Sequence, residues 1–124
     1  MTDIVYEVSI DRTGLLVVEK FSMAINYIYP VLINISCKHR VVRDEAISAL
    51  LQQQKLFYDA AKSDQISKLY LADSGLAYVK ELLRFLVDKN RKLISLKQYD
   101  VTLIHIAETG NILGSWIRSK SKKR

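Results

Sequence analysis

Residues 65–88 read QISKLYLADSGLAYVKELLRFLVD, and this stretch decides the fold class. Steps of three and four residues separate its apolar positions, which are Leu69, Ala72, Leu76, Val79, Leu83 and Leu86. Such steps place side chains on one face of an α-helix, because the helix has about 3.6 residues per turn. The stretch therefore predicts a helix that buries one side.

Three other segments have the same period, so four helices are predicted, at about residues 15–36, 41–62, 65–88 and 96–119. Their expected core positions are Val18, Phe21, Ile25, Ile28, Leu32, Ile35, then Ile47, Leu50, Gln54, Phe57, Ala61, and finally Leu103, Ile106, Gly110, Leu113 and Ile117. Short connectors make consecutive helices antiparallel. The sequence predicts one all-α domain over 1–124, an up-down-up-down antiparallel four-helix bundle.

Three local signals refine this expectation. Pro30 lies inside the first helix and predicts a single bent helix, because proline lacks the amide hydrogen. Ser95 and Gln98 have the spacing of a capping box. Gly110 and Gly114 lie one turn apart, each costing about 1 kcal/mol relative to alanine. We expect a close approach there, within the bundle or at a subunit crossing anchored by Trp116.

Charge is concentrated at the end of the chain. The formal net charge is +6, from 19 Lys and Arg against 13 Asp and Glu. Residues 118–124 read RSKSKKR and carry five of the positive charges, so 14 basic residues face 13 acidic ones in 1–117. We expect a nearly neutral body with a flexible basic tail at 119–124, a distribution consistent with a polyanionic partner.

Cysteine content and hydropathy bear on the compartment. Cys37 is the only cysteine, so an intramolecular disulfide is impossible, which fits a reducing compartment. We expect no apolar run of membrane-spanning length, and residues 1–12 are too acidic for a signal peptide. The sequence predicts a cytoplasmic protein without a membrane partner.

A second apolar stripe remains on the third helix after the core is assigned. Leu71, Tyr78 and Phe85 recur every seven residues away from the core positions, with Leu82 beside them. We interpret these residues, together with Trp116, as an oligomer interface. The alternative is a wide buried face or ordinary exposed aromatic residues.

Basic residues gather in three places. Lys80 and Arg84 are expected on the third helix, opposite the second apolar stripe. The first and third connectors share one end of an up-down bundle, which places Lys38, Arg40 and Arg43 near Lys89, Arg91, Lys92 and Lys97. The tail adds Arg118, Lys120, Lys122 and Lys123. Such clusters bind phosphates by releasing counterions. Alternatively, they reflect the preference of helix C-termini for Lys and Arg and serve solubility.

Signs of catalysis are missing from the sequence. His105 and Glu108 form a single His-x-x-Glu, whereas di-iron bundles use two Glu-x-x-His motifs and two further carboxylates. No phosphate-binding loop or dinucleotide motif occurs. We expect no enzyme activity, no metal site and no cofactor.

Several segments resemble the accessory variability determinant (Avd) proteins of diversity-generating retroelements. The resemblance covers about residues 15–118 and is carried by Val18–Phe21, Tyr27–Pro30, Lys38–His39, 62–77, Leu83–Leu86 and Ile112–Ile117. The chain also resembles the broader class of four-helix proteins encoded in ribosomal RNA intervening sequences.

The resemblance implies properties that composition does not show. It implies a barrel-shaped homopentamer with basic surfaces, encoded by a bacterium, archaeon or phage. It also implies binding to the retroelement reverse transcriptase and to RNA and DNA, in support of error-prone copying that diversifies a target gene. Lys80 and Arg84 fall within the stretch that the resemblance covers and are the first candidates for partner contacts. The alternative hypothesis is an oligomeric protein-interaction adaptor without nucleic-acid affinity.

Overall fold

The computed structural model describes residues 12–63 and 65–122. The described elements are α2 (Arg12–Ile33), the 3-10 helix η1 (Cys37–His39), α3 (Arg40–Lys62), α4 (Ile66–Val87) and α5 (Leu96–Lys122). No strand occurs in these two ranges. The all-α prediction, with four α-helices, is therefore confirmed.

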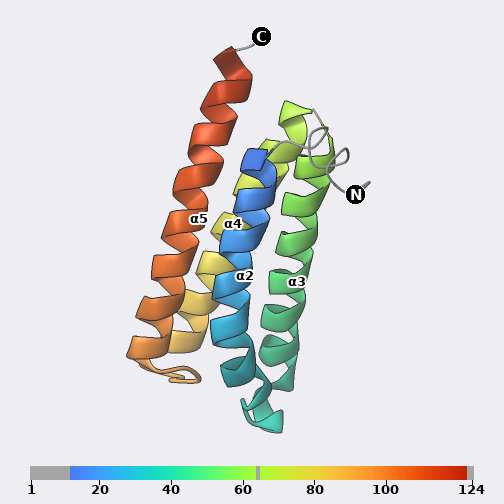
Figure 1. The fold of residues 1–124 in the computed structure, drawn as a ribbon. Helices are drawn as coiled ribbons and strands as arrows, with labels where there is room; N and C mark the ends of the chain where they lie inside the picture. The colour runs from blue at the N-terminus through green and yellow to red at the C-terminus, as the bar shows by residue number, and fades with distance from the viewer. Residues whose placement is uncertain (1–11, 64, 123–124) are drawn as a thin grey trace, which may run out of the picture.

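The four helices run alternately up and down and pack side by side (Figure 1). The main contacts join α2 to α3, α3 to α4, α4 to α5, and α5 back to α2. Each helix thus has two principal neighbours, as at the corners of a square. The α2–α3 and α4–α5 connectors lie at one end of the molecule, which we call the connector end. The C-terminal part of α5 lies at the other end.

One apolar core fills the space between the helices. Its largest fully buried side chains include Phe21 and Phe57, whose rings meet edge to face with centroids 5.2 Å apart. All six core positions predicted on α4 are buried. On α5 the buried positions are Thr102, Ile106, Thr109, Leu113 and Trp116, so three predicted positions are one residue out of place. Likewise, Ala46 and Gln53 on α3 are buried in place of Ile47 and Gln54, and Val17 and Ala24 on α2 are buried in place of Val18 and Ile25.

Two helix boundaries differ from the prediction. Helix α2 passes through Pro30 as a single helix but ends at Ile33, three residues early. Its end tightens into 3-10 turns, where the Asn34 amide donates to the Val31 carbonyl at 3.2 Å and that of Ile35 to Leu32 at 3.0 Å. Helix α5 continues through Lys122, so the predicted tail begins too early. No proline or glycine follows Gly114 to interrupt it.

The capping box at the start of α5 is confirmed. The Ser95 hydroxyl accepts a hydrogen bond from the Gln98 amide at 3.0 Å, and the Gln98 side chain accepts one from the Ser95 amide at 2.9 Å. These bonds satisfy backbone groups at the helix start. They fix the point at which the α4–α5 connector becomes helical.

Helix α2 is long and apolar enough to meet the length and composition test for a membrane span, although no such run was expected from the sequence. By length and composition, it is the one helix in the described part of the chain that is apolar enough to cross a membrane. The earlier expectation is therefore wrong for this segment. Core helices of soluble proteins pass the same test, and α2 gives Val17, Phe21, Ala24, Ile28 and Leu32 to the bundle core.

Candidate nucleic-acid and subunit interfaces

Two connectors bring basic side chains to the connector end. We define the connector cluster as Lys38, Arg40, Lys89, Lys92 and Lys97, all of them exposed. Within residues 12–63 and 65–122, none of these side chains takes part in an ion pair. Their charge is therefore available to a polyanion.

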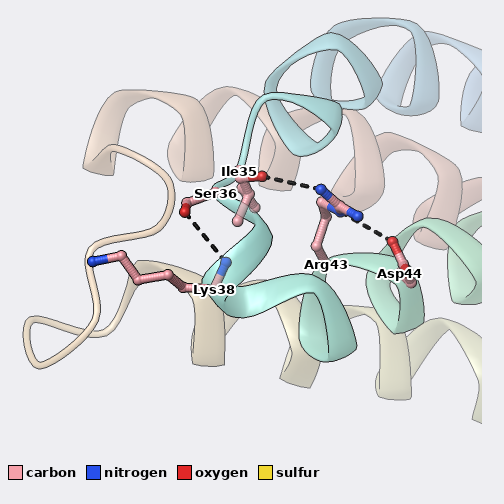
Figure 2. Close-up of polar contacts among 5 residues, drawn as sticks. All are labelled: Ile35, Ser36, Lys38, Arg43 and Asp44. Atoms are coloured by element: carbon pink, nitrogen blue, oxygen red, sulfur yellow. Dashed lines mark hydrogen bonds and ion pairs between the residues drawn. The ribbon is translucent and has the colours of Figure 1, made fainter.

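The turn that positions Lys38 is held by local hydrogen bonds (Figure 2). The Ser36 hydroxyl accepts from the Lys38 amide at 3.3 Å, and Lys38 is exposed, with its side chain pointing away from Arg43. Arg43 crosses the turn and donates to the Ile35 carbonyl at 3.3 Å and to the Asp44 carboxylate at 3.0 Å. The pKa of Arg43 is raised mainly by its hydrogen bond to Asp44. Arg43, predicted as a binding residue, is a brace for this turn.

Arg91 is also engaged within the chain. Its Nε donates to the Phe85 carbonyl at 2.9 Å, and its guanidinium lies 3.6 Å from the centre of the Phe85 ring. Asp88 stands 3.9 Å from the same group. Because these contacts hold the side chain against α4, Arg91 fixes the α4–α5 connector rather than contributing a free charge to the connector cluster.

Lys92 adopts a left-handed backbone conformation with φ 51°, the one non-glycine residue to do so in the described ranges. Its amide donates to the Asp88 carbonyl at 2.8 Å, which closes the turn after α4. A side chain costs about 1–2 kcal/mol in this conformation. The left-handed conformation of Lys92 therefore destabilises the connector slightly, and its side chain is exposed at the connector end.

Replacing Lys92 by glycine is expected to raise the free energy of unfolding by up to about 1 kcal/mol, because glycine relieves the left-handed strain. Urea unfolding at fixed protein concentration measures the change. Lys89→Gly removes the same charge from the same connector without relieving a left-handed residue. It should bring no gain, and an equal gain from both variants would contradict the explanation.

Lys80 and Arg84 occupy different surroundings. Lys80 borders a groove between α4 and α5, together with Asp73 and Asn111. Arg84 lies 3.6 Å from Glu81 and borders the α3–α4 groove beside Tyr78 and Phe85. The prediction that both residues face away from the second apolar stripe is therefore wrong for Arg84.

The basic residues near the C-terminus lie at the opposite end from the connector cluster. Arg118, Lys120 and Lys122 belong to the last turns of α5, and Arg118 donates to the Ser115 hydroxyl at 3.1 Å. Lys123 lies outside the described residues. The predicted basic residues therefore form separate patches and not one continuous surface.

Three residues of the second apolar stripe, Tyr78, Leu82 and Phe85, line a groove between α3 and α4. Leu71, Tyr78 and Phe85 are exposed and Leu82 is half-buried. Residues that line the α3–α4 groove are Val42, Tyr78, Glu81, Leu82, Arg84, Phe85, Asp88 and Arg91. The Tyr78 hydroxyl donates to the Glu45 carboxylate, a bond that raises the pKa of Tyr78, with smaller contributions from burial and charge. The predicted stripe on α4 is thus exposed enough for a partner to contact it.

Trp116 does not belong to this surface. It is only 3% exposed, and its ring would lie 2.8 Å from a Cβ placed at Gly14. Its ring therefore lies beside the start of α2 in the same chain. We remove Trp116 from the proposed interface, because its position one residue before the predicted core position Ile117 turns it inward.

A further apolar face was missed by the sequence analysis. Its exposed members are Tyr29 and Ile33 on α2 and Leu51 and Tyr58 on α3. Gln54 donates to the Val18 carbonyl at 3.0 Å and to the Ser22 hydroxyl at 2.9 Å, so the flanks of α2 and α3 meet beneath this face. The seven-residue step from Leu51 to Tyr58 is the signal that could have revealed it.

The His, Cys, Asp and Glu side chains that could serve in catalysis or metal binding do not gather at one place in the described ranges. No group of three or more His, Cys, Asp or Glu side chains in the described ranges is arranged to hold a metal ion. Glu108, from the His-x-x-Glu motif, lies 3.4 Å from the Lys20 amine, in an ion pair that joins α2 to α5. Glu108 therefore has a structural partner.

Comparison with known proteins assigns the family. No curated protein matches the chain. The model of the family described as bAvd-like matches residues 15–120, which is most of the chain and covers α3, α4 and nearly all of α2 and α5. The match agrees with the resemblance seen in the sequence. The chain therefore belongs to the bAvd-like family, an accessory, non-catalytic protein family of diversity-generating retroelements.

Proposed function

We propose that this protein is an accessory subunit that binds the retroelement reverse transcriptase together with template RNA and cDNA. It supports mutagenic reverse transcription and has no catalytic step of its own. The observation that carries the proposal is the connector cluster, five exposed basic side chains free of ion pairs at one end of a bAvd-like bundle. Clustered Lys and Arg replace condensed counterions on a nucleic acid and so bind it without reading sequence.

We further propose a homo-oligomer, with the pentamer that the family resemblance implies. Exposed apolar residues on both the α2–α3 and α3–α4 sides support this part of the proposal. Single exposed apolar residues are ordinary on a protein surface, but aligned sets mark contact sites. We place this assembly in the cytoplasm, where the reducing conditions would keep the exposed thiol of Cys37 reduced.

The alternative is an oligomeric adaptor that contacts only proteins. The apolar residues beside the α3–α4 groove favour this second function. Salt distinguishes the two, because binding to phosphates weakens log-linearly as salt rises, whereas burial of apolar surface responds little. Fluorescence anisotropy with labelled single-stranded RNA over a salt series makes the distinction.

Charge reversal at the connector cluster is expected to weaken RNA binding roughly tenfold at physiological salt. The variant is Lys38→Glu with Arg40→Glu, and its salt dependence should be shallower by about one unit per lost phosphate contact. Two matched pairs carry the same change of charge elsewhere: Lys80→Glu with Arg84→Glu, and Lys120→Glu with Lys122→Glu. Pull-down of the reverse transcriptase is measured for all three.

The three variants assign partners to surfaces. We expect the connector pair to lose RNA binding most, and the Lys80 and Arg84 pair to lose binding to the reverse transcriptase. Circular dichroism and light scattering should show unchanged helicity and oligomer size, because none of the six residues is buried in the core. RNA binding that no pair weakens would contradict the proposed function.

A further inference from the structure

A pocket of about 570 Å³ opens at the connector end, between the end of α4 and the start of α5. We call it the connector pocket, and its volume is within the range of about 300–1,000 Å³ that is usual for ligand sites. Leu96 on its wall is 67% exposed, the second highest value among the exposed large apolar side chains of the described ranges. The whole apolar lining consists of Val87, Leu93, Ile94 and Leu96.

Backbone hydrogen bonds hold both sides of the connector pocket in place. The Leu93 amide donates to the Leu86 carbonyl at 2.8 Å, which ties the connector to the end of α4. The capping box of Ser95 and Gln98 fixes the other side at the start of α5. These bonds are present without a ligand, so binding requires little further ordering of the chain.

The charge at the connector pocket is positive. Lys89 and Lys92 line it, and both are exposed and free of ion pairs in the described ranges. Among the described residues that line the pocket, none is acidic. Asp88, the acidic residue of the connector, accepts from the Asn90 amide at 2.8 Å and lies 3.9 Å from Arg91. The pocket therefore suits a ligand that combines an apolar body with negative charge.

We propose that the connector pocket holds one unpaired base of a bound nucleic-acid strand, with phosphates of the same strand at Lys89 and Lys92. The inference rests on the nucleic-acid binding of the proposed function and adds a contact that only unpaired nucleotides make. A nucleotide has the required chemistry, because its flat ring has apolar faces and is joined to an anion. The other members of the connector cluster lie at the same end of the bundle and contact neighbouring phosphates.

A base enters the connector pocket only when it is neither stacked nor paired. In a duplex, both faces of each base are covered by its neighbours, and its edge is bonded to the opposite strand. Entry from a duplex therefore requires the base to be flipped out at the loss of these contacts. The lysines attract the phosphates of either form, so the apolar lining is what distinguishes a single strand from a duplex.

The polar atoms of the connector pocket offer little recognition of base identity. Its side-chain oxygens from Ser95 and Gln98 already accept backbone amides of the capping box, at 3.0 and 2.9 Å. Sequence is read mainly through hydrogen bonds to base edges, whereas apolar contact with the face suits every base. Binding should therefore depend on the presence of a base and little on which base it is.

Strands without bases test the pocket directly. A labelled oligothymidylate is compared with a strand of equal length in which every nucleoside is replaced by an abasic tetrahydrofuran unit, so that the phosphates are the same. Fluorescence anisotropy at physiological salt should show that the wild-type chain binds the base-bearing strand about three to ten times more tightly. Leu96→Ala should remove most of this preference. Val41→Ala should retain it, because Val41 is an 81% exposed apolar residue near the same end that does not line the pocket.

Salt and strand pairing separate the pocket from the lysines. Leu96→Ala should weaken binding to the base-bearing strand by the same factor at every salt concentration, because it removes apolar contact and no charge. It should leave the affinity for a fully paired duplex unchanged. Lys89→Gln with Lys92→Gln should instead make the salt dependence shallower for both strands, by about one unit per lost phosphate contact. Circular dichroism should show unchanged helicity for these variants, because the substituted residues are exposed.

Several results would overturn the pocket while leaving the proposed function intact. They are equal binding of both strands by the wild-type chain, a preference that Leu96→Ala retains, an equal loss in Val41→Ala, and an equal loss of duplex binding in Leu96→Ala. Saturable binding of free thymidine monophosphate would assign the pocket to a free nucleotide and overturn the assignment to a strand. Failure of the wild-type chain to bind either strand would overturn this inference and the proposed nucleic-acid binding together.

Discussion

Replacing Phe57 by alanine is expected to lower the free energy of unfolding by about 3–5 kcal/mol, the usual cost of truncating a buried aromatic residue. Phe57 is fully buried on α3 and packs edge to face against Phe21 on α2. The loss combines the transfer of the ring from water, the cavity left behind and the favourable aromatic geometry. Urea unfolding followed by circular dichroism, at one fixed protein concentration, measures the change.

Gln52→Ala is the matched control for Phe57→Ala. Gln52 lies five residues earlier on the same helix and is exposed, so its truncation removes no core contact. Its effect should stay within about 0.5 kcal/mol. A loss below about 1 kcal/mol for Phe57→Ala would mean that the core is not closed around this ring, and the bundle described above would then be wrong.

The sequence predicts α4 best because every position on its buried side is apolar. Leu69, Leu76 and Leu83 keep the same phase along the whole helix, and all three are buried. On such a helix, periodicity alone determines which side faces the core. The number of helices, their order and the capping box at Ser95 could be predicted for the same reason, since each depends on local sequence.

Positions where polar side chains enter the core could not be predicted from periodicity. Thr102 and Thr109 are fully buried on α5, where their hydroxyls donate to the carbonyls of Gln98 and His105 at 2.7 and 2.9 Å. These bonds stay within the helix and remove the cost of burying a hydroxyl. A reading that seeks only apolar residues therefore chooses the neighbouring position at these two sites, while Ile106 and Leu113 on the same helix are predicted correctly.

The candidate site was predictable only in part. The prediction that the α2–α3 and α4–α5 connectors share one end of the bundle is correct, as Figure 1 shows. Composition and connector placement could not show that Arg43 and Arg91 make contacts within the chain, because both bond to backbone carbonyls that only the folded connectors place within reach. Charge counting therefore overestimated the positive charge that is free to meet a partner.

Close approaches at glycine within the bundle occur at residues other than the predicted pair. A Cβ at Gly110 or Gly114 would make ordinary contacts, at 3.8 Å to Leu76 and 3.5 Å to Arg118. The tight positions are Gly14, where a Cβ would lie 2.6 Å from that of Ala61, and Gly75. The spacing of two glycines says nothing about their neighbours, which come from helices distant in the sequence.

Gly75→Ala is therefore expected to destabilise the protein by about 1–2 kcal/mol, although alanine is the better helix former. Alanine gains about 1 kcal/mol in helix propensity. However, its Cβ would overlap the Gln53 side-chain oxygen and lie 2.9 Å from Leu56. Gln53 is only 2% exposed, and its amide donates to the Ala72 carbonyl at 2.7 Å. Displacing it leaves a buried amide without a partner, which costs about 1–3 kcal/mol in addition to the overpacking.

A double-mutant cycle isolates this cause. In a Gln53→Ala background the overlapping oxygen is absent, so Gly75→Ala should stabilise the protein by about 1 kcal/mol through helix propensity. The sign of the same substitution thus reverses between the two backgrounds, with a coupling energy of about 2–3 kcal/mol measured by urea unfolding. Equal effects in both backgrounds would show that Gln53 is not what requires glycine at this position. A reversal would establish that a polar side chain of α3 determines the residue opposite it on α4.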